Sequence, residues 1–275
     1  MRVLLIPQIL LIMAVLVSCG QQSGEIRFRT VALEAFEKHP KGTAENDGFS
    51  YKINFQYPSK YGDKDVLEKL QTLFVRYTLG EAYARSMSEA ELNKAVDAYI
   101  DVWKKAYHEN MEEMQNLNSD PDFVIGWHVE CNNAILFMNS ALLQLQTKDG
   151  WYPYGAHVFE SVSYHLFNLR TGDEYSRDDI FKPEAAENIT RLIIPELLKY
   201  WNVRTEREVR LQREKIWTQE TNFALTAEGI LIAYNDNELT EYMPGMPSLT
   251  IPYGTIMPYL REGTPVWDVA NMSNN

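Results

Sequence analysis

The feature that most restricts the fold of this sequence is the long stretch from Trp151 to Phe181. It opens with the aromatic turn Trp151-Tyr152-Pro153-Tyr154 and runs into an extended segment. Apolar side chains occupy both even and odd positions of residues 158–169, a pattern typical of a central strand that is covered on both faces. A turn at 168–172 closes the strand, and Pro183 is a suitable first residue for the helix that follows. The rest of the chain divides on either side of this stretch.

The residues before this stretch predict one small module. Residues 26–33 and 49–57 alternate apolar and polar side chains, and a short polar loop joins them, which predicts an antiparallel pair of strands. The capping pairs Asp65–Glu68 and Ser88–Glu91 predict the starts of two helices, the second being the longest of the chain. Two further strands, joined by a hairpin turn at Asn132-Asn133, complete the module.

The residues after it predict a second module. Pro195 removes a backbone donor and is expected to kink or divide the helix in which it lies. The run of mixed charge at 205–215 is typical of an exposed helix with i,i+4 ion pairs. The remaining expected elements are a hairpin, a short strand, a last helix and a loosely held tail, at residues 222–234, 248–252, 253–260 and 265–275.

The sequence therefore predicts an α+β fold of two packed modules, each an antiparallel sheet covered by helices. Lys148-Asp149-Gly150 is the expected junction between the modules. The predicted parts are a signal peptide at 1–18, a tether at 19–24, a first module at 25–150, a second module at 151–263 and a C-terminal tail at 264–275.

The N-terminus predicts export. The apolar run at 3–17 is too short to span a membrane comfortably but suits the apolar region of a secretory signal. It ends at Leu16-Val17-Ser18-Cys19, which resembles a bacterial lipobox, so we expect lipidation of Cys19 and anchoring to a membrane. Gly20 follows, as in the outer-membrane sorting pattern of Gram-negative lipoproteins, and the face of that membrane stays open. Cys131 is then left without an intramolecular partner and is expected to be a small buried residue.

Composition and motifs exclude several classes of protein. With 26 basic and 38 acidic residues the formal net charge is -12, and no long basic run is present, so we expect no nucleic-acid partner. The five histidines show no metal-ligand spacing, and the phosphate, dinucleotide and nucleophile-elbow motifs are absent, so no metal, cofactor or catalytic residue is predicted. Acidic pairs such as Asp178–Asp179 or Glu238 with Glu241 leave a glycan-cleaving enzyme open, because sequence does not show their separation in space.

Several segments of the second module carry a family resemblance: Tyr154-Gly-Ala-His157, Asn168-Leu-Arg-Thr-Gly172, Asp179-Ile-Phe181, Asn222-Phe-Ala-Leu-Thr226, Gly229, Pro244-Gly245 and Ile251-Pro-Tyr253. Together they resemble the DUF3298 family, and the first module is similar in pattern to the DUF4163 module that usually precedes it. DUF3298 regions occur in a lysozyme-sensing anti-sigma factor and beside the catalytic domain of a peptidoglycan deacetylase. The resemblance implies an exported, non-enzymatic module near the cell wall.

The candidate ligand-binding residues are Trp151, Tyr152, Tyr154 and His157. Exposed Trp and Tyr side chains stack on sugars and anchor protein interfaces, although they also fill the ends of sheets. The leading hypothesis is a non-enzymatic envelope lipoprotein that binds a lysozyme-like muramidase or peptidoglycan. The alternatives are an enzyme that acts on cell-wall glycan and a structural partner in an envelope complex, and the oligomeric state is open.

Overall fold

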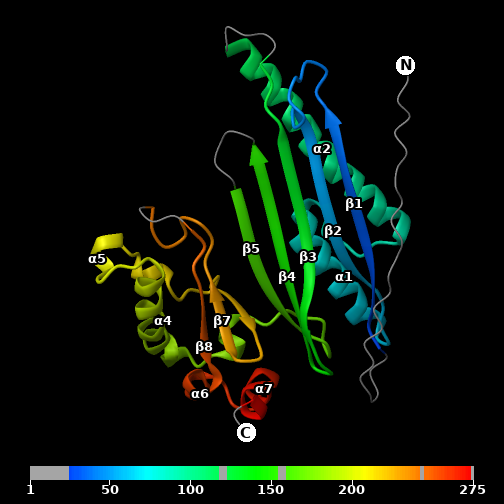
Figure 1. The fold of residues 1–275 in the computed structure, drawn as a ribbon. Helices are drawn as coiled ribbons and strands as arrows, with labels where there is room; N and C mark the ends of the chain where they lie inside the picture. The colour runs from blue at the N-terminus through cyan, green and yellow to red at the C-terminus, as the bar shows by residue number, and fades with distance from the viewer. Residues whose placement is uncertain (1–24, 118–122, 154–158, 242–244, 274–275) are drawn as a thin grey trace. The chain divides into compact units, whose positions relative to one another are not determined.

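The computed structural model describes residues 25–117, 123–153, 159–241 and 245–273 (Figure 1). The chain divides into two compact units, Met1–Trp127 and His128–Asn275. Both combine helices with strands, and the strand pairs are antiparallel, so the predicted α+β class is confirmed. The expected junction at Lys148-Asp149-Gly150 lies inside strand β4 (Leu142–Pro153), where the backbone is paired rather than free to act as a linker.

The first unit is a long hairpin with two helices packed on it. Strand β1 (Arg27–Lys38) pairs antiparallel with β2 (Gly48–Lys60), which confirms the predicted pair. The helices are α1 (Lys64–Leu79) and α2 (Glu89–Leu117), with the short 3₁₀ turn η1 (Glu81–Tyr83) between them. Its buried apolar residues come from β2 and both helices and include Ile53, Phe55, Leu70, Phe74, Leu92 and Val96.

The two long helices begin at different kinds of cap. At α2 the backbone N–H and the hydroxyl of Ser88 donate to Glu91 Oε2 at 2.9 and 2.6 Å, so the predicted capping box is confirmed. At α1 the cap is Asp63, whose Oδ1 accepts from the backbone N–H groups of Asp65 and Val66 at 2.9 and 3.1 Å. The predicted start at Asp65–Glu68 is therefore wrong. Asp63 is extended and reaches the free amides of the first turn, whereas Asp65 already lies inside the helix.

The second unit contains two groups of strands. Strands β3 (Trp127–Met138), β4 and β5 (Phe159–Asn168) are neighbours in that order. Strands β6 (Asn222–Leu225), β7 (Gly229–Ala233) and β8 (Ser248–Pro252) form a separate antiparallel sheet. The pairing of β6 with β7 confirms the hairpin predicted at 222–234.

The turn between β3 and β4 lies at Asn139–Ala141 and not at Asn132-Asn133, so the predicted turn is wrong. Strand β3 continues through both of those asparagines, and Asn133 is buried. Asn139 Oδ1 accepts from the backbone N–H groups of Ala141 and Leu142, each at 2.8 Å. An asparagine that bonds the backbone two and three residues ahead closes a turn, which the Asn132-Asn133 pair does not do.

Strand β5 is an edge strand, which corrects the expectation of a central one. Its sheet neighbour among the described residues is β4. Two side chains cover its other edge: Val162 N donates to Asn235 Oδ1 at 2.8 Å, and Tyr164 N donates to Asn222 Oδ1 at 2.7 Å. Asn222 Nδ2 also donates to Val162 O at 2.6 Å. The asparagines thus supply hydrogen bonds that a further strand would otherwise make.

The helices of the second unit are mostly short. They are α3 (Arg177–Ile180), η2 (Pro183–Ala185), α4 (Ala186–Tyr200), α5 (Glu206–Val209), η3 (Arg213–Lys215), α6 (Tyr253–Ile256), η4 (Met257–Tyr259) and α7 (Pro265–Ser273). Pro195 lies within α4 and does not divide it, and a kink at this position stays a prediction. None of the helices in the described ranges has the length and apolar character needed to cross a membrane.

Two further expectations for the second unit are corrected. The charged run at 205–215 forms two separate turns, in which Arg213 bridges Glu206 at 3.2 Å and Glu187 at 3.6 Å instead of making i,i+4 pairs. Residues 265–273 form α7 and bury Val266, so this part of the chain is not a loose tail.

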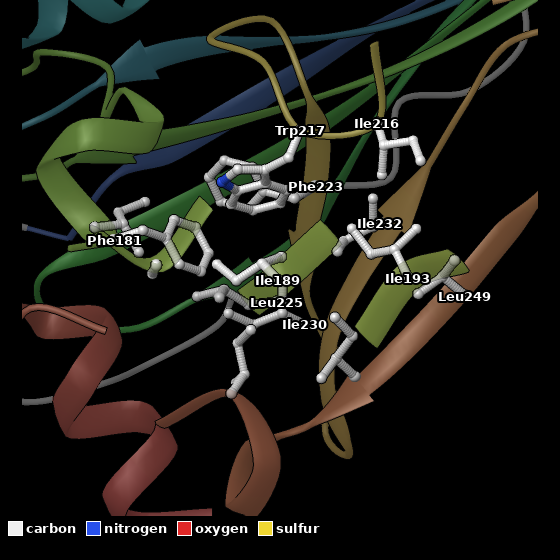
Figure 2. Close-up of a cluster of buried hydrophobic side chains, with 14 of the residues drawn as sticks. Phe181, Ile189, Ile193, Ile216, Trp217, Phe223, Leu225, Ile230, Ile232 and Leu249 are labelled. Carbon is white, nitrogen blue, oxygen red and sulfur yellow. The ribbon is translucent and has the colours of Figure 1, made fainter. Parts of the chain in front are cut away.

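The core of the second unit lies between α4 and the sheet of β6, β7 and β8 (Figure 2). Ile189 and Ile193 of α4 are fully buried in it, and the strands contribute Phe223, Leu225, Ile230, Ile232 and Leu249. Phe181 packs edge-on against Trp217, with ring centroids 4.9 Å apart and planes at 89°. Such burial of large apolar side chains is the main stabilising contribution in a chain of this size.

Candidate binding site on the second unit

A pocket of ≈190 Å³ lies over one end of β4 and β5. Its lining comes from β3, β4, β5 and the segment before β8, and consists of Glu130, Lys148, Asp149, Gly150, Tyr152, Glu160, Ser161, Val162 and Met246. The lining holds more carboxyl groups than ammonium groups, so the pocket favours cations. Met246 and the ring of Tyr152 add apolar surface.

The register of β4 with β5 assembles most of this lining. Lys148 pairs with Val162, and Gly150 pairs with Glu160. Side chains two residues apart on a strand share a face, so Tyr152 lies on the same face of β4 as Lys148 and Gly150. The alternate residues of β4 and of β5 therefore meet on one face of the sheet. They are Lys148, Gly150, Tyr152, Glu160 and Val162.

Gly150 allows Tyr152 to reach Glu160. A Cβ atom at Gly150 would lie only 2.5–2.9 Å from ring atoms of Tyr152, so the ring occupies the space above the glycine. In this position the Tyr152 hydroxyl donates a hydrogen bond to Glu160 Oε1. Burial of the phenol, together with the nearby carboxylates of Glu160 and Glu130, raises the pKa of Tyr152. The phenol therefore stays protonated and acts as a donor.

Strand β3 extends the polar cluster. His128 Nε2 lies 3.4 Å from Glu130 Oε1, and the centroid of the His128 ring lies 5.7 Å from that of Tyr152. His128 and Glu130 are two residues apart on β3 and so share a face. The site thus has two carboxylates, Glu130 on β3 and Glu160 on β5. Tyr152 lies on β4, the strand between these two.

Asp149 contributes a different kind of carboxyl group. Burial raises its pKa to about 6, and a hydrogen bond with the side chain of Cys131 opposes this rise. Asp149 pairs with Ser161 in the register of β4 with β5. Because Asp149 is three residues from Tyr152 in the same strand, the two side chains lie on opposite faces. Cys131 is fully buried, as expected from its apolar surroundings.

The structure separates the residues predicted to bind a ligand. Trp151 and Tyr152 are consecutive in β4 and lie on opposite faces of the strand. Trp151 stacks on Phe159, with centroids 5.0 Å apart and planes at 15°, and Phe159 is 56% exposed. Of the predicted residues, Tyr152 lines the pocket. Tyr154, His157 and Cys19 lie outside the described residues.

Sequence reasoning missed Glu130, Lys148 and Glu160. The sequence offered a hint for one of them. Lys148 is four residues from Tyr152, so in an extended strand the two side chains share a face. Glu130 and Glu160 become neighbours only through the pairing of β3, β4 and β5, which no local pattern specifies. Among the residues that the structure describes, no group of three or more His, Cys, Asp or Glu side chains is arranged to hold a metal ion.

Three of the carboxylates considered for glycan cleavage, Asp178, Asp179 and Glu238, have structural roles. Asp178 Oδ2 accepts from Gln219 Nε2 at 2.5 Å, and its Oδ1 accepts from Arg177. Asp179 caps α3 by accepting from the backbone N–H of Ser176 at 2.8 Å. Glu238 Oε2 accepts from the backbone N–H of Asn235 at 2.8 Å. These carboxylates fix loops and helix ends, and they are absent from the lining of the pocket.

Comparison with protein families gives a class for the second unit. Residues 178–254 match DUF3298, a family described as a protein of unknown function. The chain therefore carries a DUF3298 domain, which contains α4 and the sheet of β6, β7 and β8. Most of the pocket precedes the matched residues, and only Met246 lies within them.

Two solved structures share the fold. A DUF3298 family member from Bacteroides fragilis aligns with a TM-score of 0.72 and 22% identity, covering 90% of this chain and 98% of that chain. A DUF3298 family protein from Pseudomonas aeruginosa aligns with a TM-score of 0.53 and 17% identity, covering 86% of this chain and 95% of that chain. Among curated proteins, none matches this sequence.

Proposed function

We propose that this chain is a non-enzymatic lipoprotein of the cell envelope, anchored through Cys19, which binds a basic, lysozyme-like muramidase. In this proposal residues 25–150 are the DUF4163-like module that precedes DUF3298 in related proteins. The observation that carries the proposal is the pocket, in which Glu130, Glu160 and Tyr152 form a surface that attracts a cation. The net charge of -12 also attracts a basic partner over longer distances.

The volume of the pocket favours a protein ligand over a glycan. Sites for small organic ligands usually measure about 300–1,000 Å³, whereas this pocket measures ≈190 Å³. It therefore suits one Lys or Arg side chain, whose aliphatic part can lie against Met246 and Tyr152. A saccharide chain would need a longer groove with several exposed aromatic rings.

An enzyme that acts on cell-wall glycan is the second candidate, and Asp149 is the observation that favours it. A carboxylic acid whose pKa is raised to about 6 by burial resembles the general acid of a glycosidase. Against this, Asp149 and Glu160 lie on opposite faces of the paired strands, and Asp149 bonds to the buried Cys131. The two groups therefore do not flank a common bond, and binding is the better supported function.

Calorimetry of Gln21–Asn275 against a c-type lysozyme and, separately, against muropeptides tests the proposal. We expect lysozyme binding that weakens as salt increases, because ion screening reduces attraction between charges. Replacement of Glu160→Gln should weaken it further, whereas Glu112→Gln, an exposed change on α2, should not. Absence of lysozyme binding at low salt would refute the proposal. Muropeptide binding alone would make peptidoglycan the ligand, and cleavage of peptidoglycan that Asp149→Asn abolishes would establish the enzyme.

A further inference from the structure

Among the described residues, one edge of strand β1 in the first unit has no strand partner, and we call it the open edge of β1. The strand is 12 residues long and pairs with β2 along one side, and no other described strand pairs with it (Figure 1). Residues 32–38 are all exposed, and they include the large apolar side chains Leu33 (37% exposed) and Phe36 (42% exposed). Strands are usually about 5–6 residues long, so β1 presents an unusually long row of backbone groups.

The edge of β5 shows how this chain protects a strand when it has no strand partner. Asn222 and Asn235 bond the backbone of Val162 and Tyr164 there. An unprotected edge is a template for pairing with another chain, so natural proteins generally cover it. The contrast between the covered edge of β5 and the open edge of β1 suggests that β1 pairs with a further strand.

The charges of β1 indicate which strand that is. Its sequence, RFRTVALEAFEK, has basic residues near the start, at Arg27 and Arg29, acidic residues later, at Glu34 and Glu37, and a last residue, Lys38, that is basic. Two copies paired in parallel would set like charges side by side, which destabilises a sheet. Two copies paired antiparallel can set Arg27 of each copy beside Glu37 of the other. The strand is therefore complementary to itself in the antiparallel direction.

We propose that β1 pairs antiparallel with β1 of a second copy, about a two-fold axis at Ala32. A two-fold axis normal to the sheet keeps the odd-numbered side chains of both copies on one face, so directly paired residues are both odd or both even. The pairing centred on Ala32 sets Val31 against Leu33 and Arg27 against Glu37. The first pair covers the exposed Leu33 with an apolar side chain. In the second, Arg27 joins the ion pair that Glu37 makes with Lys104 at 2.7 Å.

The same pairing makes a prediction specific to two alanines. Ala32 faces its own copy across the axis, whereas Ala35 faces Arg29. Both alanines are exposed and lie in the same strand, on opposite faces of it. Residues directly opposite in an antiparallel pair have Cα atoms about 4.5–5.5 Å apart. This separation lies within the range of about 4.4–6.8 Å that a disulfide bridges.

Cysteine cross-linking of the full chain tests the pairing under mild oxidation. Ala32→Cys should form a disulfide-linked dimer on a non-reducing gel, and Ala35→Cys should form little or none. The native chain is the second control, because it keeps Cys19 and the buried Cys131 and lacks only the added cysteine. Equal cross-linking of the two variants would reflect random collision and would overturn the proposal. So would the absence of a dimer with Ala32→Cys.

Charge substitution gives an independent readout through co-purification of two differently tagged full-length copies. Ala32→Glu in both copies places like charges against each other across the axis and should abolish co-purification. Ala35→Glu places a carboxylate opposite Arg29 and should preserve it. Ala32→Glu in one copy with Ala32→Lys in the other should restore it. Equal behaviour of Ala32→Glu and Ala35→Glu would mean that β1 pairs with something other than a second copy.

Discussion

At the scale of single residues, the pocket depends on the face of β4 on which each side chain lies. Gly150 has no side chain, and the ring of Tyr152 fills the space above it and reaches Glu160. One residue earlier, Asp149 lies on the other face of β4 and is half-buried. Two neighbouring residues therefore have unlike roles, because a strand turns successive side chains to opposite faces.

The half-buried carboxyl group of Asp149 should make stability depend on pH. Its pKa rises from 3.8 to about 6 on folding, so the folded state holds the proton more tightly than the unfolded state. The stability gained from that proton is complete below pH 3.8 and is lost as the pH rises through about 6. A shift of about two units corresponds to at most about 3 kcal/mol.

Replacement of Asp149→Asn tests this pH dependence. The amide keeps the shape of the side chain but does not titrate, so the variant should gain stability relative to the native protein between pH 4 and pH 7. Denaturant unfolding at the two pH values measures the change. A constant difference between the two proteins would show that Asp149 does not titrate in this range.

At the scale of elements, strand edges distinguish the two units. Strand β5 has its outer edge bonded by Asn222 and Asn235, whereas no described strand covers the outer edge of β1. The apolar pattern of residues 158–169 predicted a central strand in place of β5. That prediction was wrong because side-chain amides from distant segments take the place of a neighbouring strand. A hydrophobicity pattern contains no information about such hydrogen bonds.

Asn222→Ala should loosen β5. The change removes the acceptor for Tyr164 N and the donor to Val162 O, and a buried group that loses its partner costs about 1–3 kcal/mol. Denaturant unfolding measures the loss, and hydrogen exchange at the amide of Tyr164 should become faster. Asn93→Ala, on the exposed face of α2, is the control and should change stability by less than about 0.5 kcal/mol. Unchanged exchange at Tyr164 would contradict the role assigned to Asn222.

At the scale of the whole molecule, the last helix belongs to the core of the second unit. Val266, Val269 and Ala270 of α7 are buried in the cluster that also contains Ile256 and Leu260. The sequence analysis predicted a loosely held tail at residues 265–275. Its order comes from burial of one face against residues that precede it in the chain.

Val266→Ala should therefore destabilise the protein. Loss of two buried methyl groups and the resulting cavity should cost about 1.5–3 kcal/mol. Met272→Ala in the same helix is the matched control, because Met272 is 67% exposed and its truncation should have little effect. Thermal unfolding of both variants measures the difference. Equal midpoints would show that α7 does not contribute to the core.

Much of the fold could be predicted from local patterns. The capping box at Ser88–Glu91, the pairing of β1 with β2 and the hairpin of β6 with β7 are all confirmed. Each depends on hydrogen bonds or alternation within one short segment or between two that are close in sequence, so neighbouring residues carry the necessary information. The segments that resemble DUF3298 likewise led to the domain that the family comparison identifies at residues 178–254.

The sequence by itself determined the α+β class, most of the elements and their order. The tertiary structure alone decided which strands are edges, where the β3–β4 turn lies and which side chains meet at the pocket. Glu130 lies on β3 and Glu160 lies on β5, with β4 between them. Only the register of these three strands brings both carboxylates to Tyr152. Register is set by burial and pairing over the whole sheet, and a shift of one residue would turn each of these side chains to the other face.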